Sequence, residues 1–587
     1  MINVDSILNE QLPTLQQSPK LEKTVRTVCK KLLHEEEINT FLNDHAHLGA
    51  SNFLDHVMQR LGLSFLVNNW ELENIPTSGR VVIIANHPLG SLDGIALLKM
   101  VSQVRSDIKI VANEILSNIE PLESYFLPVD NMKGRAKKEQ YQAIEQSLNT
   151  EEAVIFFPAG EVSRWRLDGI KDNHWRTGFL RIAKKTQSPI LPIYVGGKNS
   201  KFFYGLSLLS KPMSVLLLVK EMFRTTKITV PMTIGEIIPF SQIDKLPTNL
   251  PVSAQLFRKH VYTLNSRKKN KGGGNQALVF ETEKPIAAPQ QRQHLLAELA
   301  QCERLSSTDD GKESYLLTNA KDTRLLNEIG RLRELSFRTV GEGTGCRIDT
   351  DEYDNYYHHI ILWDPKQLEI VGAYRVVPTK DIAIDKLYSS TLFNYQENIK
   401  KIKPQGLEMG RSFVQPKYRG KRSLDYLWNA IGAYLIKFPE LRYLFGPVSI
   451  SADYKKELHQ WLVFYYLKYY GSKDNAKFYN LAQAKLPLLF TDAVLQDLTE
   501  QFAGLDHKEG FKLLKSHVKL FNMAVPTLLK QYTELCDPEH VNYCAFNIDP
   551  LFNNCIDGLV MVDSYNVLQK KSDKYFPGRK INQQLIT

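Results

Sequence analysis

Short apolar runs alternate with helical stretches along residues 81–195. Four runs have the length and composition of buried strands: VVIIA (81–85), IKIVA (108–112), AVIFF (153–157) and PILPIYV (189–195). The spacing of apolar residues between them is helical in GIALLKMVSQV (94–104) and KKEQYQAIEQSL (137–148). Strands that alternate with helices predict an α/β layer fold for this part of the chain.

The first 75 residues have a helical pattern. The segment 53–67, FLDHVMQRLGLSFLV, carries apolar residues at helical spacing, and IPTSG (75–79) ends the pattern. We therefore expect residues 1–75 to form a helical segment and residues 76–265 to form the first α/β domain.

A basic, glycine-rich stretch, SRKKNKGGGNQ (266–276), separates two halves of the chain. A second α/β pattern follows it, with strands expected at 358–364, 368–377 and 443–450 and an amphipathic helix at 423–438. The expected organisation is a linker over 266–300, a second α/β domain over 301–570 and a polar tail over 571–587.

The charge and the cysteines narrow the possible partners and the compartment. The 587 residues carry a net charge of +10, which suits nucleic acid, an anionic membrane or an acidic protein. The six cysteines have neither disulfide-motif nor zinc-site spacing, which favours free thiols in a reducing cytoplasm. Neither a secretion signal nor a spanning helix is expected. Residues 202–223 are interrupted by Lys211 and Pro212, and they fit an interfacial segment as well as a buried helix and strand.

The sharpest chemical pattern is VVIIANHPLGSLDG (81–94). A buried strand ends at His87, and Asp93 follows near the start of a helix. Open α/β sheets bind their ligands at this edge. A carboxylate beside an imidazole fixes its tautomer, so that the other ring nitrogen takes a proton from an attacking hydroxyl. The alternative is a turn histidine followed by a helix-capping aspartate.

These residues resemble the first motif of the glycerolipid acyltransferase family, in the NHPxGxxDG form typical of its hemolysin-like branch. Three further blocks resemble that family in order: SYFLPVDNMKGR (124–135), FFPAGEVSR (156–164) and SPILPIYV (188–195). The resemblance implies an α/β fold in which His87 and Asp93 are catalytic. It also implies a set of substrate-binding residues: Asn86, Gly90, Lys133, Arg135, Phe157, Pro158, Gly160, Glu161 and Pro192. Of these, Glu161 either orients the substrate or pairs with Arg164, and Pro192 lines the acyl channel.

The C-terminal half carries a separate set of charged residues. Asp351 and Asp354 flank a presumed strand start, where they would hold a cationic amine, and Glu408 and Arg411 have the spacing of an ion pair. The loop QPKYRGKRS (415–423) precedes a helix and offers cations and N–H groups to a phosphate. For each residue the simpler interpretation is a solvated surface charge.

Taken in order, these residues resemble the GCN5-related N-acyltransferases (GNAT), and more narrowly the ornithine N-acyltransferases, relatives of acyl-homoserine-lactone synthases. The resemblance implies a GNAT-like α/β domain and a site built from Arg333, Phe337, Asp351, Asp354, Arg375, Glu408, Arg411, Arg419 and Gly420. Glu408 is a candidate base. His358 and His359 have no third ligand at suitable spacing, so we expect strand packing and no metal.

An O-acyltransferase domain followed by an N-acyltransferase domain resembles the bifunctional bacterial ornithine-lipid synthases. The resemblance implies N-acylation of an amino acid, ornithine first, with a 3-hydroxyacyl chain, and then O-acylation of the new 3-hydroxyl. It further implies acyl carrier protein or acyl-CoA as the donor, no other cofactor, no nucleic acid, and a peripheral position on the inner face of the cytoplasmic membrane. Three alternatives stay open: a lysophospholipid acyltransferase with a non-catalytic C-terminal module, a cytolysin, and a homoserine-lactone-type signal synthase.

Overall fold

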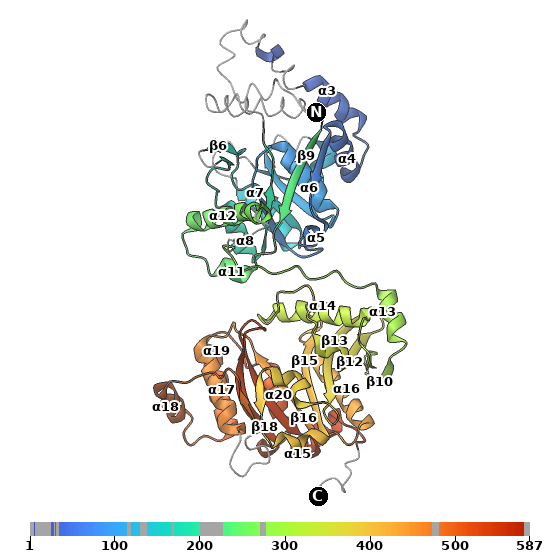
Figure 1. Ribbon diagram of the computed structural model, residues 1–587, viewed down its shortest axis with the longest axis vertical. Coiled ribbons are helices and arrows are strands. Elements are labelled where there is room, and N and C mark those ends of the chain that lie inside the picture. The colour runs from blue at the N-terminus through green and yellow to red at the C-terminus, as the bar shows by residue number, and fades with distance from the viewer. Residues whose placement is uncertain are drawn as a thin grey trace. The chain divides into compact units, whose positions relative to one another are not determined.

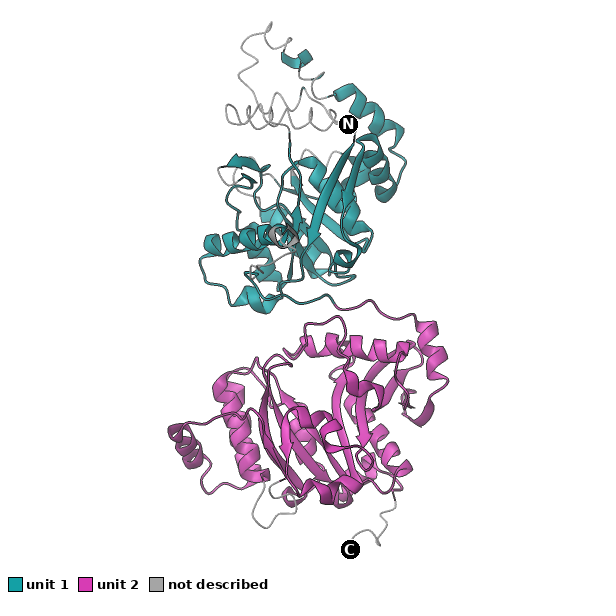
Figure 2. Cartoon of the chain, viewed as in Figure 1, with its two compact units in different colours: residues 1–285 teal, residues 286–587 magenta. Residues whose placement is uncertain are grey.

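The computed structural model describes residues 5, 25–28, 30, 34–113, 119–129, 138–166, 169–199, 227–269, 278–471 and 481–579. The chain divides into two compact units, residues 1–285 and 286–587 (Figure 2). The boundary falls inside the expected linker. The expectation for residues 202–223 lies outside the described residues, and none of the described helices has the length and apolarity needed to cross a bilayer.

Unit 1 is built on a seven-stranded sheet with the order β1-β9-β8-β2-β5-β3-β4 (Figure 1). Its pairs are parallel except for β8 and β9. The strands are β1 (Leu63–Leu66), β2 (Val81–Ala85), β3 (Ile108–Asn113), β4 (Phe126–Val129), β5 (Ala153–Phe156), β8 (Ile190–Val195) and β9 (Ile228–Ile234). The helices are α3 (Glu35–Asp44), α4 (Ala50–Arg60), α5 (Asn69–Leu72), α6 (Ser91–Ser102), α7 (Lys138–Asn149), α8 (Gly178–Thr186), α11 (Phe240–Asp244) and α12 (Leu250–Lys269). A small hairpin, β6 (Arg164–Arg166) and β7 (Gly169–Lys171), lies outside the sheet.

Both faces of this sheet are apolar because helices cover both of them. Val81 and Ile83 point into one core cluster, and Val82 and Ile84 point into another. A strand buried on two faces has no alternation of polar residues, which is why β2 is the continuous run VVIIA. The predicted α/β fold is confirmed for this unit.

The expected helix over 53–67 is wrong in its second half. Helix α4 ends at Arg60, Gly62 takes a left-handed φ of 57°, and residues 63–66 form β1. Strand β1 pairs in parallel with β9, more than 160 residues further on. Helical spacing within 53–67 does not reveal this partner, so tertiary pairing overrides the local pattern.

Unit 2 contains an eight-stranded sheet with the order β10-β11-β12-β13-β15-β16-β19-β18. These strands are β10 (Glu303–Ser307), β11 (Glu313–Leu317), β12 (His358–Asp364), β13 (Glu369–Pro378), β15 (Gly406–Val414), β16 (Tyr443–Ile450), β18 (Val541–Asp549) and β19 (Cys555–Asp563). A small pair, β14 (Phe393–Tyr395) and β17 (Ala482–Ala484), is separate. The helices are α13 (Arg292–Leu299), α14 (Arg324–Arg338), α15 (Ile399–Ile402), α16 (Ser423–Lys437), α17 (Lys456–Tyr470), α18 (Asp492–Gln501), α19 (His507–Leu520), α20 (Thr527–Thr533) and α21 (Gln569–Tyr575).

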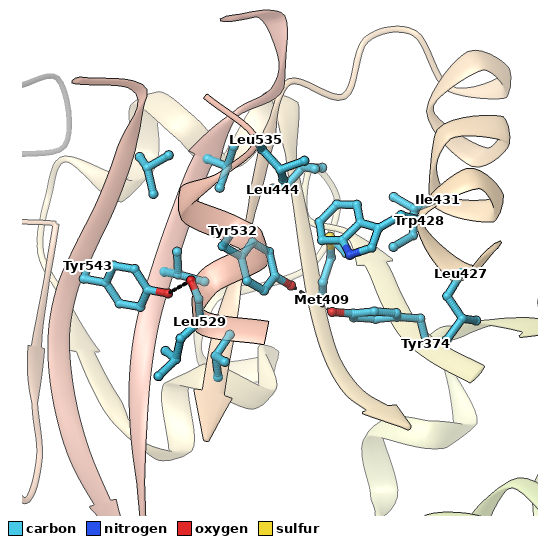
Figure 3. Close-up of a cluster of buried hydrophobic side chains, with 14 of the residues drawn as sticks. Tyr374, Met409, Leu427, Trp428, Ile431, Leu444, Leu529, Tyr532, Leu535 and Tyr543 are labelled. Atoms are coloured by element: carbon cyan, nitrogen blue, oxygen red, sulfur yellow. Dashed lines mark hydrogen bonds between the residues drawn. The ribbon is translucent and has the colours of Figure 1, made fainter. Parts of the chain in front are cut away.

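One face of this sheet packs on α16, α17 and α20 in the largest core cluster of the unit. Figure 3 shows that part of this core is aromatic and that the hydroxyls of three of its tyrosines have hydrogen-bond partners. The hydroxyls of Tyr374 and Tyr532 lie 3.0 Å apart, and Tyr543 donates to the backbone oxygen of Leu529 at 3.1 Å. Buried polar groups are tolerated in an apolar core when they are hydrogen-bonded in this way.

Two segments expected to be free of structure pack against unit 2. Helix α13 lies inside the expected linker and buries Leu295 and Leu299. Helix α21 lies at the start of the expected polar tail, and Tyr575 and Phe576 are buried in the main core. The two helices are only eight and seven residues long, so neither has enough turns to show a clear helical period in the sequence.

Candidate active sites

The first candidate site lies where β2 gives way to α6. Nδ1 of His87 is 3.2 Å from Oδ2 of Asp93, although the contact does not have full hydrogen-bond geometry. The ring of Phe157 stacks on the imidazole with centroids 4.1 Å apart. The His87 side chain is 18% exposed and that of Asp93 is fully buried. The arrangement leaves an accessible imidazole with a carboxylate behind it.

The turn between these two residues is held by the carboxylate itself. The backbone N–H groups of Leu89 and Gly90 donate to Oδ2 of Asp93 at 2.8 and 3.1 Å. Gly90 has a φ of 81°, a conformation that favours glycine. The role of Asp93 as a helix cap and its place beside His87 are therefore both present, and the two interpretations from the sequence do not exclude each other.

Asn86 ties the end of β2 to the end of β8. Its side-chain nitrogen donates to the backbone oxygen of Val195 at 2.7 Å, and its side-chain oxygen accepts from the Val195 N–H at 2.7 Å. The two strands are already neighbours in the parallel sheet. Asn86 is thus a positioning residue that fixes the backbone immediately before His87.

Asp172 is a further member of this site that the sequence did not point to. Its buried carboxylate accepts from the His87 N–H at 3.2 Å, from the Ser163 hydroxyl at 2.5 Å and from the Trp175 indole at 2.9 Å. The Ser163 N–H in turn donates to the His87 backbone oxygen at 2.8 Å. Asp172 lies in no recognisable motif, so only the fold brings it to the histidine.

Burial raises the pKa of the Asp93 carboxyl above its ordinary value, and the nearby His87 ring and two N–H groups oppose that rise. Its second oxygen, Oδ1, has no hydrogen-bond partner among the described residues. A buried carboxylate is stabilised by a cationic neighbour. The turn therefore holds a buried acidic group 3.2 Å from the imidazole.

The remaining residues of the first set are spread over nearby loops. The backbone oxygen of Pro158 accepts from the Arg176 N–H at 2.9 Å, and Gly160, with a φ of 65°, faces the Arg176 guanidinium. Glu161 accepts from the Asn173 amide and lies 3.9 Å from Arg164, so it has protein partners. Pro192 is buried within β8 beside Gly235. Lys133 and Arg135 lie outside the described residues.

The second candidate site is a polar band across the other face of the unit 2 sheet. Every second residue of β13 illustrates this band. Ala373 belongs to an apolar cluster beside α14, Arg375 comes next, and Val377 belongs to a second apolar cluster. In β19, Cys555 and Leu559 belong to the same two clusters, with Asp557 between them. Charged residues are rarely buried in a core, so a band of them between two apolar clusters is a candidate binding or catalytic site.

The expected amine-binding pair is occupied by arginines. Asp354 is fully buried and pairs with Arg333 at 2.8 Å and with Arg375 at 3.1 Å. Asp351 pairs with Arg375 at 2.5 Å and also caps the short helix that follows it. The two arginines hold the pKa of Asp354 far below its ordinary value against the effect of burial. The expectation that this pair holds a substrate amine is therefore corrected to a structural ion network.

Glu408 does not pair with Arg411, contrary to the expectation. It is 1% exposed, and it accepts hydrogen bonds from the Tyr357 hydroxyl and from the Ser389 N–H, the latter at 2.7 Å. Burial raises the pKa of its carboxyl. Both oxygens are engaged, so the predicted role of Glu408 as a base requires one of these bonds to be released.

Arg411 instead faces two carboxylates, Asp349 and Asp351, in the segment between α14 and β12. Its guanidinium lies 3.5 Å from Asp349 and 3.9 Å from Asp351, between the rings of Tyr388 and Phe552 at 5.1 and 4.6 Å. Its backbone has a left-handed φ of 48° beside a β-bulge against β13. A strained residue of this kind is re-aimed out of the regular ladder, which is typical of functional positions.

The last expected residues border α14. The Phe337 ring packs edge-on against Phe552 with centroids 5.1 Å apart. Arg419 donates to the Ser336 backbone oxygen and the Thr339 hydroxyl, each at 2.7 Å, and the exposed Gly420 has a φ of 73°. Loop 415–423 is thereby fastened to the end of α14, and the Arg419 guanidinium has protein partners.

His359 is buried beside Arg333, and burial lowers its pKa to about 3. His358 lies 2.9 Å from the Tyr434 hydroxyl. Within the described part of the chain, no group of three acidic, histidine or cysteine side chains has the arrangement of a metal site. Both histidines therefore have packing partners.

Comparison with known proteins matches each half of the chain to a family model. Residues 6–269 match the family model described as "Acyltransferase", and residues 332–429 match "Acetyltransferase (GNAT) domain". The fold and these matches define an acyltransferase with two different transfer domains. The chain belongs to the acyltransferase family, and the predicted combination of an acyltransferase domain with a GNAT domain is confirmed.

Individual relatives of this chain are named as acyltransferases of an amino acid or of an amino-acid lipid. It is 30% identical to a glycine N(alpha)-acyltransferase and 31% identical to a lyso-glycine lipid O-acyltransferase, both from Bacteroides thetaiotaomicron. The matches cover 45% and 42% of this chain, and 82% and 92% of those proteins. It is 26% identical to an L-ornithine N(alpha)-acyltransferase from Rhodobacter capsulatus, over 45% of this chain and 95% of that protein.

Proposed function

We propose that this chain makes a doubly acylated amino-acid lipid in two steps. Unit 2 attaches a 3-hydroxyacyl group to the α-amine of an amino acid, and unit 1 esterifies the 3-hydroxyl of that product. The observation that carries the proposal is the accessible His87 backed by the buried Asp93, in a chain that also holds a GNAT domain. In Bacteroides thetaiotaomicron, relatives named for the two activities are separate proteins, each matched over less than half of this chain.

The O-acyl step follows from the geometry at His87. The free Nε2 removes the proton of the acceptor hydroxyl as the oxygen attacks the thioester carbonyl. The carbon–sulfur bond then breaks, and the leaving thiolate receives the proton from the imidazolium. Asp93 stabilises the cationic ring between the two transfers, as a carboxylate does in a catalytic triad. Phe157 keeps the ring plane fixed by stacking.

The N-acyl step takes place, on this proposal, at the polar band of unit 2. Strands β15 and β16 are hydrogen-bonded in parallel only from Gly406 to Glu408, and β15 continues to Val414. Beyond Glu408, the backbone N–H and C=O groups of β15 are no longer paired with β16, and Arg411 lies in this stretch. An acyl thioester bound beside these groups would meet the amine at the polar band. Acyl carrier protein is the proposed donor, since the net charge of +10 suits an acidic carrier.

The amino acid is either ornithine or glycine. The order of charged residues resembles ornithine N-acyltransferases, while the relatives named for glycine are more similar, at 30% against 26% identity. A peripheral position on the inner face of the cytoplasmic membrane belongs to the same proposal, because the product of the first step is a lipid.

The test uses the purified full chain with 3-hydroxyacyl carrier protein or the matching CoA thioester, and with glycine or ornithine. Mass spectrometry is expected to find first an N-acylated and then an N,O-diacylated amino acid. Acylation of a lysophospholipid, with no amino acid acylated under any condition, would contradict the proposal and support an O-acyltransferase whose C-terminal unit is not catalytic.

A further inference from the structure

The side chain of Arg176 in unit 1 lies against the turn 157–160, which follows β5. Its backbone N–H donates to the oxygen of Pro158 at 2.9 Å. Its guanidinium packs on Gly160, with the guanidinium carbon 3.1 Å from the place where a Cβ on that glycine would lie. Gly160 has a φ of 65°, a conformation that favours glycine. Any larger residue there would displace the guanidinium, so the turn is shaped to hold it.

His87 contacts the same turn at its other end. The Gly160 N–H donates to the Phe157 oxygen at 3.0 Å and closes the turn. The Phe157 ring stacks on the imidazole with centroids 4.1 Å apart. The end residues of a β-turn lie within about 7 Å of each other, measured between their Cα atoms. Arg176 and His87 therefore lie on either side of one short turn.

The backbone that carries Arg176 is fastened to His87. The Asp172 carboxylate accepts from the His87 N–H at 3.2 Å and from the Trp175 indole at 2.9 Å, and Trp175 is buried. Residues 172–176 are thus tied to the turn and to the histidine at both ends, by Asp172 at the start and by the Arg176 N–H at the finish. These contacts hold the guanidinium in place relative to the imidazole.

Arg176 has no carboxylate partner in the described part of the chain. Its side chain is exposed and makes neither a hydrogen bond nor an ion pair there. The Glu161 carboxylate, next to Gly160, accepts instead from Asn173 and lies 3.9 Å from Arg164. A guanidinium binds a carboxylate through two parallel, charge-assisted hydrogen bonds. Arg176 thus presents oriented and unused donors to solvent.

The acceptor in the O-acyl half of the proposed function carries a carboxylate. Acylation of the α-amine leaves this group free, whichever amino acid is used. The reacting 3-hydroxyl is separated from the carboxylate by a chain about as long as two extended residues, roughly 7 Å. That length matches the span of the turn between His87 and Arg176. One acceptor molecule can therefore place its hydroxyl at the imidazole and its carboxylate at the guanidinium.

We propose that Arg176 binds the carboxylate of the acceptor and thereby makes unit 1 selective for acylated amino acids. This inference rests on the O-acyl half of the proposed function and names the residue that recognises its acceptor. The contact also orients the 3-hydroxyl toward His87. A neutral lipid alcohol lacks the group that satisfies the guanidinium, so it is a poorer acceptor.

The decisive experiment measures ester formation by the full chain with two acceptors, N-(3-hydroxyhexadecanoyl)glycine and the corresponding glycinamide. The two differ in the charge of the head group. The unaltered protein is expected to prefer the carboxylate at least tenfold in kcat/KM. Arg176→Gln should raise KM for the carboxylate at least tenfold and leave KM for the acyl donor within twofold. It should not change kcat/KM for the glycinamide, so the preference disappears.

Arg181→Gln is the matched control, because it removes the same charge from an exposed position on α8 and should keep the preference. Thermal denaturation checks that each variant folds. Arg176→Lys keeps the charge but not the paired donors, so it should give an intermediate preference, and it decides the question if Arg176→Gln does not fold.

An unchanged preference in the Arg176 variants, or an equal loss with both acceptors, would overturn the inference and leave the proposed function intact. An equal loss would show that Arg176 only supports the turn. Failure of the unaltered protein to esterify N-(3-hydroxyhexadecanoyl)glycine, its glycinamide or the ornithine counterpart would overturn the O-acyl half of the proposed function, and the inference with it.

Discussion

At the scale of single residues, the first site depends on a carboxylate that has several functions. Asp93 holds the turn through two N–H groups and faces His87 from a fully buried position. The sequence predicted this pair because the two residues lie on either side of one short turn. It did not predict Asp172, which meets His87 only after the chain has formed β5 and the hairpin that follows.

Replacing Asp93 with asparagine tests the electrostatic part of its role. The amide keeps the shape and loses the charge that stabilises the imidazolium, so we expect the rate of O-acylation to fall by about 100-fold or more. N-acylation should stay at the level of the unaltered protein. A steady-state assay of ester formation checks this, and a loss smaller than threefold would argue that the carboxylate only shapes the turn.

Two buried carboxyls of unit 2, Glu342 and Asp557, predict how stability depends on pH. The pKa values of Glu342 and Asp557, about 7 and 8, are raised above the ordinary carboxyl range, so the folded state holds protons that the unfolded chain gives up. Stability should therefore fall as the pH rises from 5 to 9. In Asp557→Asn this fall should be smaller, as measured by the thermal midpoint across that range. An equal fall in both proteins would contradict the raised pKa.

At the scale of elements, the sequence predicted the strands buried on two faces better than the elements held by distant partners. The run VVIIA at 81–85 and the segment 443–450 coincide with β2 and β16. The helical spacing of residues 53–67 predicts a helix where β1 forms, because the partner strand β9 lies far along the chain. The sequence did not predict which charged residues of unit 2 pair, since the positions of α14, β13 and β15 in the fold decide which arginine meets which carboxylate.

Helix α21 gives a test at this scale, because the end of the chain was expected to be a polar tail. Phe576 is 3% exposed, in the core beside α16. Phe576→Ala should lower the free energy of unfolding of unit 2 by about 3–5 kcal/mol through the lost burial and the cavity. Lys570→Ala, at an exposed position of the same helix, is the control. Equal denaturant midpoints for the two variants would show that this segment does not belong to the core.

At the scale of the whole molecule, two transfer domains in one chain carry separate chemistry. Each unit has its own sheet, its own core and its own candidate site. Arg411→Ala removes a cation of the second site and should cost at least tenfold in amide formation. Ester formation from a supplied N-acyl amino acid should be unchanged, because that step uses unit 1. Parallel loss of both activities would contradict separate sites.

The most direct test of the central claim is the product made by His87→Ala from an acyl thioester and the amino acid. Mass spectrometry should show the mono-acylated amino acid accumulating, with the diacylated lipid reduced by at least 100-fold, because the alcohol has lost its base. Formation of the diacylated lipid at the rate of the unaltered protein would contradict the account.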